Sequence, residues 1–274
     1  MKQVASLRYG VIFKKAFCDV EIFKGFVRDI LGIQLEIDTV ETEKTFDVPV
    51  GRVQPRFDLF AEDKKNRIIV DIQHERHTDH YDRFLHYHCV ALLEQINQAQ
   101  DYRPRLKVFT IVVLTSGDRH KKDVSVINFD PHDLSGQPLR EIHHKIIYLC
   151  PKYLNDQTPP AYREWLRAID DSLDEQVEET GYHLPEILKI FQHIEKDLVS
   201  PEERARMIEE YHSMESKRKF FVEGKQEGKL EGKLEGKLEV AKNLLAQGMS
   251  ISTVAEVTGL SENEIIAIES NHGE

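Results

Sequence analysis

The chain has 274 residues, 40% of them hydrophobic and 31% charged, and its formal net charge is −11. This length and composition suit one large domain, or one domain with appendages, around a real hydrophobic core. The acidic balance excludes a strongly basic nucleic-acid-binding protein, so any DNA contact must come from local basic patches or a bound metal ion.

The cysteines and the hydropathy bear on the cellular compartment. Cys18, Cys89 and Cys150 are odd in number and far apart. This favours reduced thiols over a disulfide framework. No apolar stretch resembles a signal peptide or a membrane span. We therefore expect a cytoplasmic protein without membrane contact.

The first part of the chain alternates between helical and extended patterns. The spacing of apolar residues predicts, in order, a helix over 11–31, an extended segment over 35–48, a hairpin over 56–73, a helix over 80–99, an apolar strand over 107–115 and a strand over 142–149. This order of helix, three strands, helix and strand predicts an α/β sandwich built on one central sheet.

From about residue 156 the strands end and the pattern becomes helical. Helices are predicted over 161–179, 184–198 and 201–219, the last with Ser200 as N-cap and Pro201 at its first position. The predicted organisation is therefore a core over 1–155, a helical extension over 156–222 and a tail over 223–274.

The hairpin is the most informative segment. If Lys64 and Lys65 form its tip, Glu62 pairs with Arg67, Phe60 with Ile69, Asp58 with Asp71, and Arg56 with Gln73. The opposite face is then wholly apolar, with Phe57, Leu59, Ala61, Ile68, Val70 and Ile72. This supports the register, because a shift by one residue would move the apolar set off the core.

This register has a chemical consequence. Directly opposed residues have Cβ atoms about 5 Å apart, and two carboxylates at that distance raise one pKa or bind a cation. Mg²⁺ commonly uses one or two carboxylates and a substrate phosphate. We interpret Asp58 and Asp71 as metal ligands and Gln73, two residues beyond Asp71, as part of the same site. The alternative is an exposed polar face of the sheet.

The tail contains a repeat of period four with the pattern Glu-Gly-Lys-Leu. Its glycines, Gly224, Gly228, Gly232 and Gly236, form one stripe of a helix. Each glycine costs about 1 kcal/mol in a helix, and like charges four residues apart repel. The pattern leaves two alternatives open, a helix stabilised by a partner helix and a flexible linker.

Residues 251–265 predict a helix, a glycine turn and a second helix, which resembles a helix-turn-helix. Ser261 and Glu264 form a capping box at the start of the second helix. That helix carries acidic residues and no Lys or Arg, which is poor equipment for reading bases. A packing or assembly role is the interpretation we prefer.

The chain from Phe13 through Thr115 resembles the Rpn-type recombination-promoting nucleases, a transposase-like family of the PD-(D/E)xK nuclease superfamily. The matching segments are Phe13-Lys14-Lys15-Ala16-Phe17, Phe57-Asp58-Leu59, Val70-Asp71-Ile72-Gln73-His74, Tyr81-Asp82-Arg83-Phe84-Leu85-His86-Tyr87 and Asp101-Tyr102. The Glu-Gly repeat and the Ala-Glu-Val-Thr-Gly-Leu-Ser tail are similar to that family's C-terminus.

The resemblance implies a metal-dependent DNA endonuclease with an αβββαβ core. In it, Asp58 is the first acidic ligand and Asp71 the acid of the second half-motif. Gln73 replaces the usual Lys, and a neutral amide can only orient water or donate a hydrogen bond. The family also tends to have an acidic residue near Gly10, which is absent here, and Asp19 and Glu21 are the nearest substitutes.

Three neighbours of the motif are candidate substrate-binding residues. Arg83 and Tyr87 are four residues apart on a predicted helix and share a face, suited to a DNA phosphate. The alternative is a local pair with Tyr87 half-buried. His74 is a candidate for contacting phosphate or orienting a carboxylate.

We therefore expect a Mg²⁺-dependent DNA endonuclease linked to DNA recombination or mobile elements, which assembles into a homo-oligomer through its tail. The alternative is a catalytically degenerate DNA-binding or assembly protein that retains the nuclease fold. The opposed aspartates favour the enzyme, whereas the altered half-motif and the missing first-helix acid favour the alternative.

Overall fold

The computed structural model describes residues 1–46, 54–75, 80–96 and 102–270. The chain divides into two compact units, Met1–Glu210 and Tyr211–Glu274. Among the described residues, no helix is both long and apolar enough to span a membrane. Among the described residues, Cys18, Cys89 and Cys150 form no disulfide bond.

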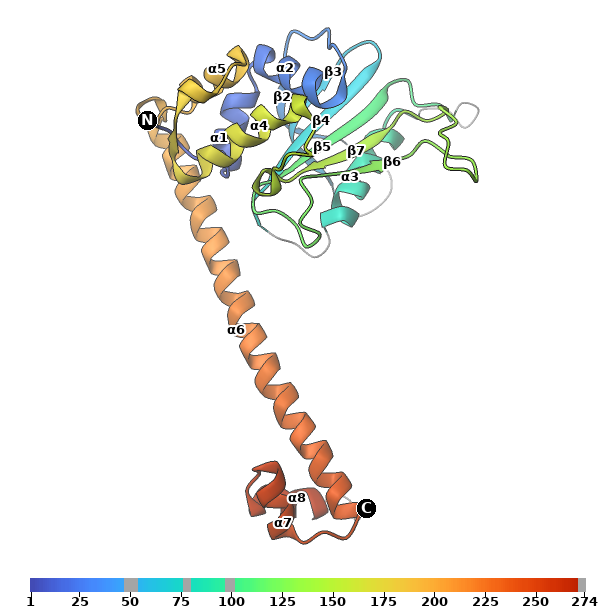
Figure 1. Cartoon of the computed structure of the whole chain (residues 1–274), viewed down its shortest axis with the longest axis vertical. Helices are drawn as coiled ribbons and strands as arrows, with labels where there is room; N and C mark the ends of the chain where they lie inside the picture. The colour runs from blue at the N-terminus through green and yellow to red at the C-terminus, as the bar shows by residue number, and fades with distance from the viewer. Residues whose placement is uncertain (47–53, 76–79, 97–101, 271–274) are drawn as a thin grey trace. The chain divides into compact units, whose positions relative to one another are not determined.

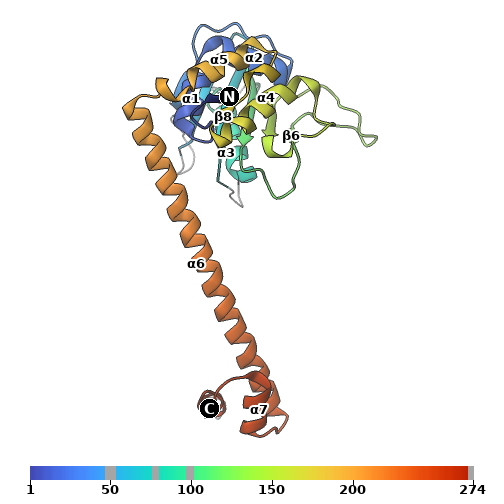
Figure 2. The ribbon, with the colours of Figure 1, turned by 60° about the vertical axis from the view of Figure 1, so that its left-hand side comes forward.

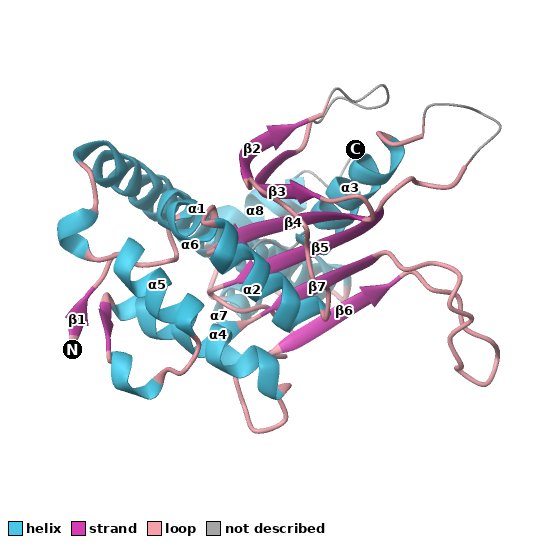
Figure 3. Cartoon of the chain, turned by 90° about the horizontal axis from the view of Figure 1, so that it is seen from above, coloured by secondary structure: helices cyan, strands magenta, loops and turns pink. Residues whose placement is uncertain are grey.

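The first unit is built on a sheet of six strands in the order β2-β3-β4-β5-β7-β6 (Figure 3). The strands are β2 (Glu41–Thr45), β3 (Arg56–Glu62), β4 (Asn66–Gln73), β5 (Lys107–Leu114), β6 (Val124–Asn128) and β7 (Lys145–Leu149). The central strands β4, β5 and β7 are parallel, and β2, β3 and β6 are added antiparallel at the two sides. Residues Val108–Leu114 of β5 are all buried, because helices cover both faces of a parallel sheet.

Helices cover the two faces unequally. Helix α3 (His80–Leu93) packs on β5 and β7. Helices α1 (Gly10–Phe17) and α2 (Val20–Leu31) lie on the other side of the sheet, together with α4 (Pro160–Asp171) and α5 (Pro185–His193) (Figures 1 and 3). Helix α1 contacts β3 and β4, and α4 and α5 pack against α2. The predicted α/β sandwich with an all-α C-terminal region is confirmed.

The single helix predicted over 11–31 is wrong, because the structure has two helices there. The break falls at Cys18 and Asp19, where the Asp19 side chain accepts hydrogen bonds from the backbone N–H groups of Glu21 and Ile22. A carboxylate that caps a helix N-terminus favours a new start at that point. The apolar periodicity continues through the break, which is why the sequence pattern did not reveal it.

Three strands, β1 (Lys2–Gln3), β6 and β8 (Gln176–Val177), escaped prediction, and the helix predicted over 161–179 is too long. Strand β6 lies at the edge of the sheet, and its half-exposed residues give little hydrophobic signal. The helix predicted over 161–179 ends at Asp171, and the chain then forms the short strand β8. Strand β8 pairs antiparallel with β1, next to the N-terminus (Figure 2).

Helix α6 (Pro201–Ala246) begins with the predicted Ser200 cap, because Ser200 Oγ accepts the N–H of Glu203 at 3.2 Å. It continues without interruption through the glycine repeat, where the sequence left helix and linker open. A Cβ built on Gly224, Gly228, Gly232 or Gly236 meets no atom of the described residues within 4 Å. The glycine stripe is thus open on its outer side.

The second unit has a small core of its own. Helix α7 (Ile251–Thr258) ends at Gly259, whose φ of 64° suits glycine, and α8 (Glu262–Ser270) follows. The predicted capping box is confirmed, since Ser261 Oγ accepts the Glu264 N–H and Glu264 accepts the Ser261 N–H. The buried side chains of this core are Ala241, Val254, Leu260, Ile265 and Ile268.

Candidate functional site

The hairpin forms in the predicted register. Glu62 lies opposite Arg67 and Phe60 opposite Ile69, and the regular ladder extends to Leu59 opposite Val70. The next pair in this register is Asp58 and Asp71. The site therefore begins where the regular ladder between β3 and β4 ends.

At that point the two aspartates bond to each other's strand. Asp71 Oδ1 accepts a hydrogen bond from the Asp58 N–H at 3.1 Å, and Asp58 Oδ2 accepts one from the Ile72 N–H at 3.1 Å. These side-chain bonds occupy backbone donors where the regular ladder stops. Each carboxylate is therefore held against the strand that carries the other.

One part of the predicted hairpin faces is wrong. Phe57 packs with its ring centroid 6.4 Å from that of Phe60 and 5.8 Å from that of Tyr87 on α3. Two residues three positions apart thus share the α3 face, and the alternation of the strand is broken between them. On β2, Glu43 stands opposite Asp58 in the register and has a φ of 58°, so both strands are distorted at the same level.

Asp71 is buried, Asp58 is partly exposed, and the pair is electrostatically costly. Asp71 is 4% exposed. Burial and the neighbouring Asp58 raise the pKa of Asp71 well above its usual value. Burial also raises the pKa of Asp58, although the Lys14 ammonium acts in the opposite direction. A site that strains two carboxylates in this way favours a cation or a shared proton.

Lys14 is a member of the site that sequence reasoning missed. Its Nζ lies 3.5 Å from Asp58 Oδ1, and it forms a second ion pair with Glu43. Helix α1 places it there because α1 packs on β3 and β4. The available signal in the sequence is its position between Phe13 and Phe17 in the segment that resembles the family, and this position alone does not indicate a role.

Gln73 contributes an oxygen. Its Nε2 donates to the Glu75 carbonyl at 2.8 Å, while Oε1 is buried and has no hydrogen-bond partner among the described residues. Asp71 Oδ2 is likewise buried and unpartnered. Gln73 is 8% exposed, and it lies two residues from Asp71 on one strand, so both side chains project from the same face.

These oxygen donors fit a hard divalent cation such as Mg²⁺. Asp58, Asp71 and Gln73 are the residues that would hold it, because an unpartnered buried oxygen is costly unless something binds it. Within the described part of the chain, however, no three or more His, Cys, Asp or Glu side chains form a ready-made metal cage.

The predicted substrate-binding residues are arranged as follows. Arg83 and Tyr87 share a face of α3, with Arg83 Nε 3.3 Å from the Tyr87 hydroxyl. Arg83 is exposed and Tyr87 is buried, and the charge of Arg83 lowers the pKa of Asp71. His74 Nδ1 lies 2.8 Å from Thr115 Oγ1, and burial lowers the pKa of His74. Of the three, Arg83 is the side chain best placed to meet an anion.

Neither residue proposed to replace the missing first-helix acid belongs to the site. Asp19 caps α2 and pairs with Lys189, and Glu21 is exposed. The apparent continuity of the helix over 11–31 concealed this capping role. The two candidates are therefore excluded by their own local contacts.

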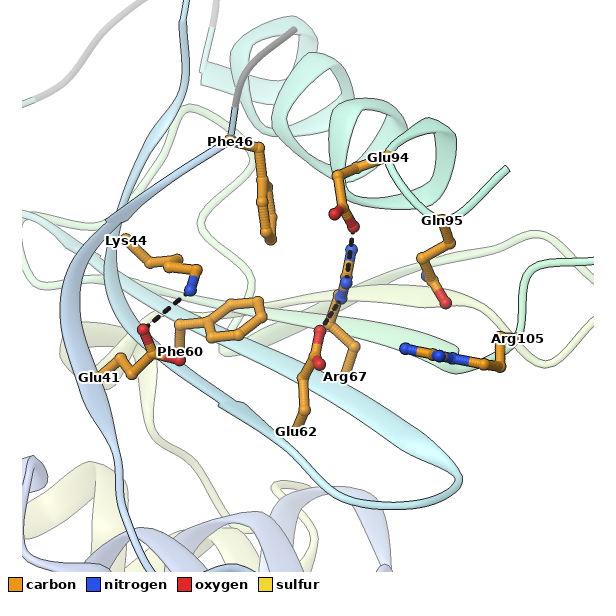
Figure 4. Close-up of a pocket in the computed structure, with 9 residues that line it drawn as sticks. All are labelled: Glu41, Lys44, Phe46, Phe60, Glu62, Arg67, Glu94, Gln95 and Arg105. Carbon is orange, nitrogen blue, oxygen red and sulfur yellow. Dashed lines mark hydrogen bonds and ion pairs between the residues drawn. The ribbon is translucent and has the colours of Figure 1, made fainter. Parts of the chain in front are cut away.

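A separate pocket of about 280 Å³ lies at the turn end of the hairpin (Figure 4). Arg67 crosses it, forms ion pairs with Glu62 and Glu94, and donates to the Ala91 carbonyl at 2.6 Å. Neither Asp58 nor Asp71 lines this pocket. Arg67 thus ties α3 to the hairpin, Lys44 pairs with Glu41, and the pocket does not extend the carboxylate site.

Two family models match the chain. The model described as PD-(D/E)XK nuclease family transposase matches residues 11–220. The model described as Rpn/YhgA-like nuclease family, C-terminal HTH domain, matches residues 234–270. No curated protein and no solved structure matches the chain. Since the first match spans more than half of the sequence, the chain belongs to the PD-(D/E)XK nuclease family transposases and carries the C-terminal HTH domain of the Rpn/YhgA-like nucleases.

Proposed function

We propose that the protein is a DNA endonuclease that hydrolyses phosphodiester bonds with Mg²⁺ or another divalent cation, in DNA recombination or the movement of mobile elements. The observation that carries this proposal is the Asp58–Asp71 pair, together with the buried oxygens Asp71 Oδ2 and Gln73 Oε1, which have no hydrogen-bond partner among the described residues. Family membership supports the reaction class.

In this proposal the carboxylates, the neutral Gln73 and the cationic side chains have different roles. When bound, a divalent cation lowers the pKa of a coordinated water and offsets the phosphate charge. Asp58 and Asp71 would hold the cation, and Gln73 Oε1 would either bind it or accept a hydrogen bond from the attacking water. Lys14 and Arg83 are the nearby cations on either side of the carboxylates, suited to the charge that develops on the phosphoryl oxygens.

DNA is the proposed partner. Arg83 offers a phosphate contact beside the carboxylates, which would position the backbone without reading sequence. The name of the second family model supports DNA binding by the tail. The first turn of α8 carries Glu262 and Glu264, so any contact from this unit is better suited to assembly or positioning than to direct base recognition.

We also propose that the protein assembles into a homo-oligomer through α6. Helix α6 exposes the open glycine stripe of the repeat and large apolar side chains, including Phe220, Phe221 and Leu230. Another helix could approach closely along such a stripe, and a two-fold dimer is the simplest closed assembly.

A specific observation favours a second candidate, a catalytically degenerate DNA-binding or assembly protein. The half-motif has Gln73 where the superfamily has Lys, so the chain lacks the group that commonly activates the water. Such a protein would bind DNA through the same surface without cleaving it.

Plasmid nicking separates the two candidates. We expect wild-type protein to nick supercoiled DNA with Mg²⁺ and not with EDTA, and Asp71→Asn to lose about 100-fold or more of this activity. Asp38→Asn, which changes an exposed aspartate, is the matched control and should retain full activity. DNA binding without cleavage by the wild type would support the second candidate.

A further inference from the structure

Glu210 lies far from the nuclease motif in sequence but not in space. Its Oε2 accepts a hydrogen bond from the Gly10 N–H at 2.8 Å, and its Oε1 accepts one from the Val11 N–H at 3.2 Å. Glu210 belongs to α6 and is half-buried, and it is the last residue of the first unit. The helical extension thus places a carboxylate at the first turn of α1.

The carboxylate occupies the space that a side chain at residue 10 would enter. A Cβ built on Gly10 lies 3.7 Å and 3.8 Å from the two Glu210 oxygens and 3.9 Å from Lys14 Nζ. The same ammonium lies 3.5 Å from Asp58 Oδ1. Glu210 and Asp58 therefore flank one lysine.

The electrostatics agree with this proximity. Burial raises the pKa of Glu210, and of the two nearby charges Lys14 lowers it while Asp58 raises it further. Four carboxylates lie near the single Lys14 ammonium, namely Glu43, Asp58, Asp71 and Glu210. The site therefore carries an excess of negative charge. Two unpartnered buried oxygens, Asp71 Oδ2 and Gln73 Oε1, lie in the same site and call for a cation.

We propose that Glu210 is the third carboxylate of the cation site that Asp58 and Asp71 begin, and that it replaces from α6 the acidic side chain absent at Gly10. This role rests on the proposed function. Because the described residues hold no ready-made three-carboxylate cage, the Lys14 side chain must withdraw from Asp58 when the cation is held. The complete site then needs the helical extension as well as the core over 1–155.

The competing explanation is that Glu210 merely caps α1. The N-cap residue Tyr9 makes no side-chain capping bond, so the first turn of α1 benefits from an acceptor in any case. A cap needs only an acceptor oxygen, whereas a cation site needs the negative charge. The substitution Glu210→Gln separates these two needs.

The experiment measures binding of Mn²⁺ alone to full-length protein by isothermal titration calorimetry, without DNA. We expect Glu210→Gln to weaken Mn²⁺ binding about tenfold or more. Glu209→Gln, which removes the same charge from the adjacent exposed residue, should bind like wild type. Lys14→Met should bind Mn²⁺ at least as tightly as wild type, because it removes the competing ammonium.

A carboxylate introduced at residue 10 tests whether the lost Mn²⁺ affinity can be restored. Gly10 does not have a positive φ, and a Cβ there makes only ordinary van der Waals contacts. The double variant Gly10→Asp/Glu210→Ala, which also clears the space beside residue 10, should therefore recover most of the Mn²⁺ affinity that Glu210→Gln loses. Should Glu210→Gln fail to fold, Glu210→Asp, which keeps the charge but withdraws it by one methylene, is expected to weaken binding as well.

The outcomes are distinct. Wild-type affinity in a folded Glu210→Gln or Glu210→Asp variant would show that Glu210 is only a cap and overturn this role, while leaving the proposed function intact. Weaker binding by Lys14→Met would also contradict it. If the wild type itself binds no Mn²⁺, the proposed function fails together with this inference.

Discussion

Asp71 is the residue where burial and charge conflict most strongly. Its pKa is raised above its unfolded value of about 3.9 by burial and by Asp58, so the folded protein holds the proton more tightly than the unfolded chain. The ionised form therefore costs stability progressively as pH rises through the raised pKa. Below about pH 4 both states are protonated and the cost disappears.

Asp71→Asn should therefore stabilise the metal-free protein at pH 8, since the amide oxygen can still accept the Asp58 N–H without a charge. The gain over wild type should shrink as pH falls towards 4. Adding Mg²⁺ should raise the melting temperature of the wild type and leave that of the variant unchanged. Thermal melts from pH 4 to 8 test this, and a variant less stable than wild type at pH 8 would contradict it.

In the Gln73 side-chain amide the nitrogen is hydrogen-bonded and the oxygen is available, and this difference limits the roles that Gln73 can have. Its Nε2 is bound to the Glu75 carbonyl, and Oε1 is the end available to a ligand. Gln73→Lys should therefore raise the Mg²⁺ concentration for half-maximal nicking about tenfold, because a cation replaces an oxygen donor. An unchanged Mg²⁺ requirement with equal or higher rate would instead assign Gln73 to water positioning.

At the scale of elements, Arg67 joins the hairpin to α3. It is almost fully buried, its guanidinium carbon lies 4.8 Å from the centre of the Phe46 ring, and both of its carboxylate partners retain solvent contact (Figure 4). Arg67 lies at the turn end of β3 and β4, and Asp58 and Asp71 lie at the other end of these strands. It stabilises the hairpin register without taking part in the site.

Arg67→Met should lower the free energy of unfolding by about 3 kcal/mol, because it breaks a buried ion-pair network. The loss should not be larger, because the two remaining carboxylates can still reach water. The folded variant should bind Mn²⁺ like wild type. Arg105→Met is the control, since Arg105 lines the same pocket but is exposed. Chemical denaturation measures both, and a large loss of Mn²⁺ affinity in folded Arg67→Met would extend the site to this pocket.

At the scale of the whole molecule, the charge pattern and glycine stripe of α6 bear on assembly. The Glu and Lys stripes of the repeat repel along each helix, and a facing helix can neutralise them. Two copies would bring two nuclease cores to one duplex. A dimer would thus be expected to cut both strands more readily than a monomer.

Truncation after Phe221 should shift the protein towards monomer in sedimentation and reduce double-strand breaks more than nicks. The full-length variant Gly228→Leu/Gly232→Leu is the sharper test. It should strengthen the isolated helix, since each glycine costs about 1 kcal/mol, yet block close approach along the stripe. A monomeric truncated form beside a monomeric wild type would identify the repeat as a spacer.

The sequence by itself determined the hairpin register, the α/β class, the caps of α6 and α8 and the helix-turn-helix pattern. These features depend on neighbours within a few residues or on strict alternation, so local physics specifies them. It did not reveal the break at Asp19, because apolar periodicity continues across it, nor the α3-facing side chain of Phe57, because two adjacent strands distort together there.

Only the tertiary structure decided which charged groups surround the aspartates. Lys14 reaches Asp58 because α1 packs on β3 and β4, and Glu210 reaches α1 across 200 positions of sequence. Neither contact leaves a periodic signal, because each is one side chain whose position depends on how whole helices pack. A charged site depends on which side chains are close in space, whereas a sequence pattern reflects only the spacing of residues along the chain.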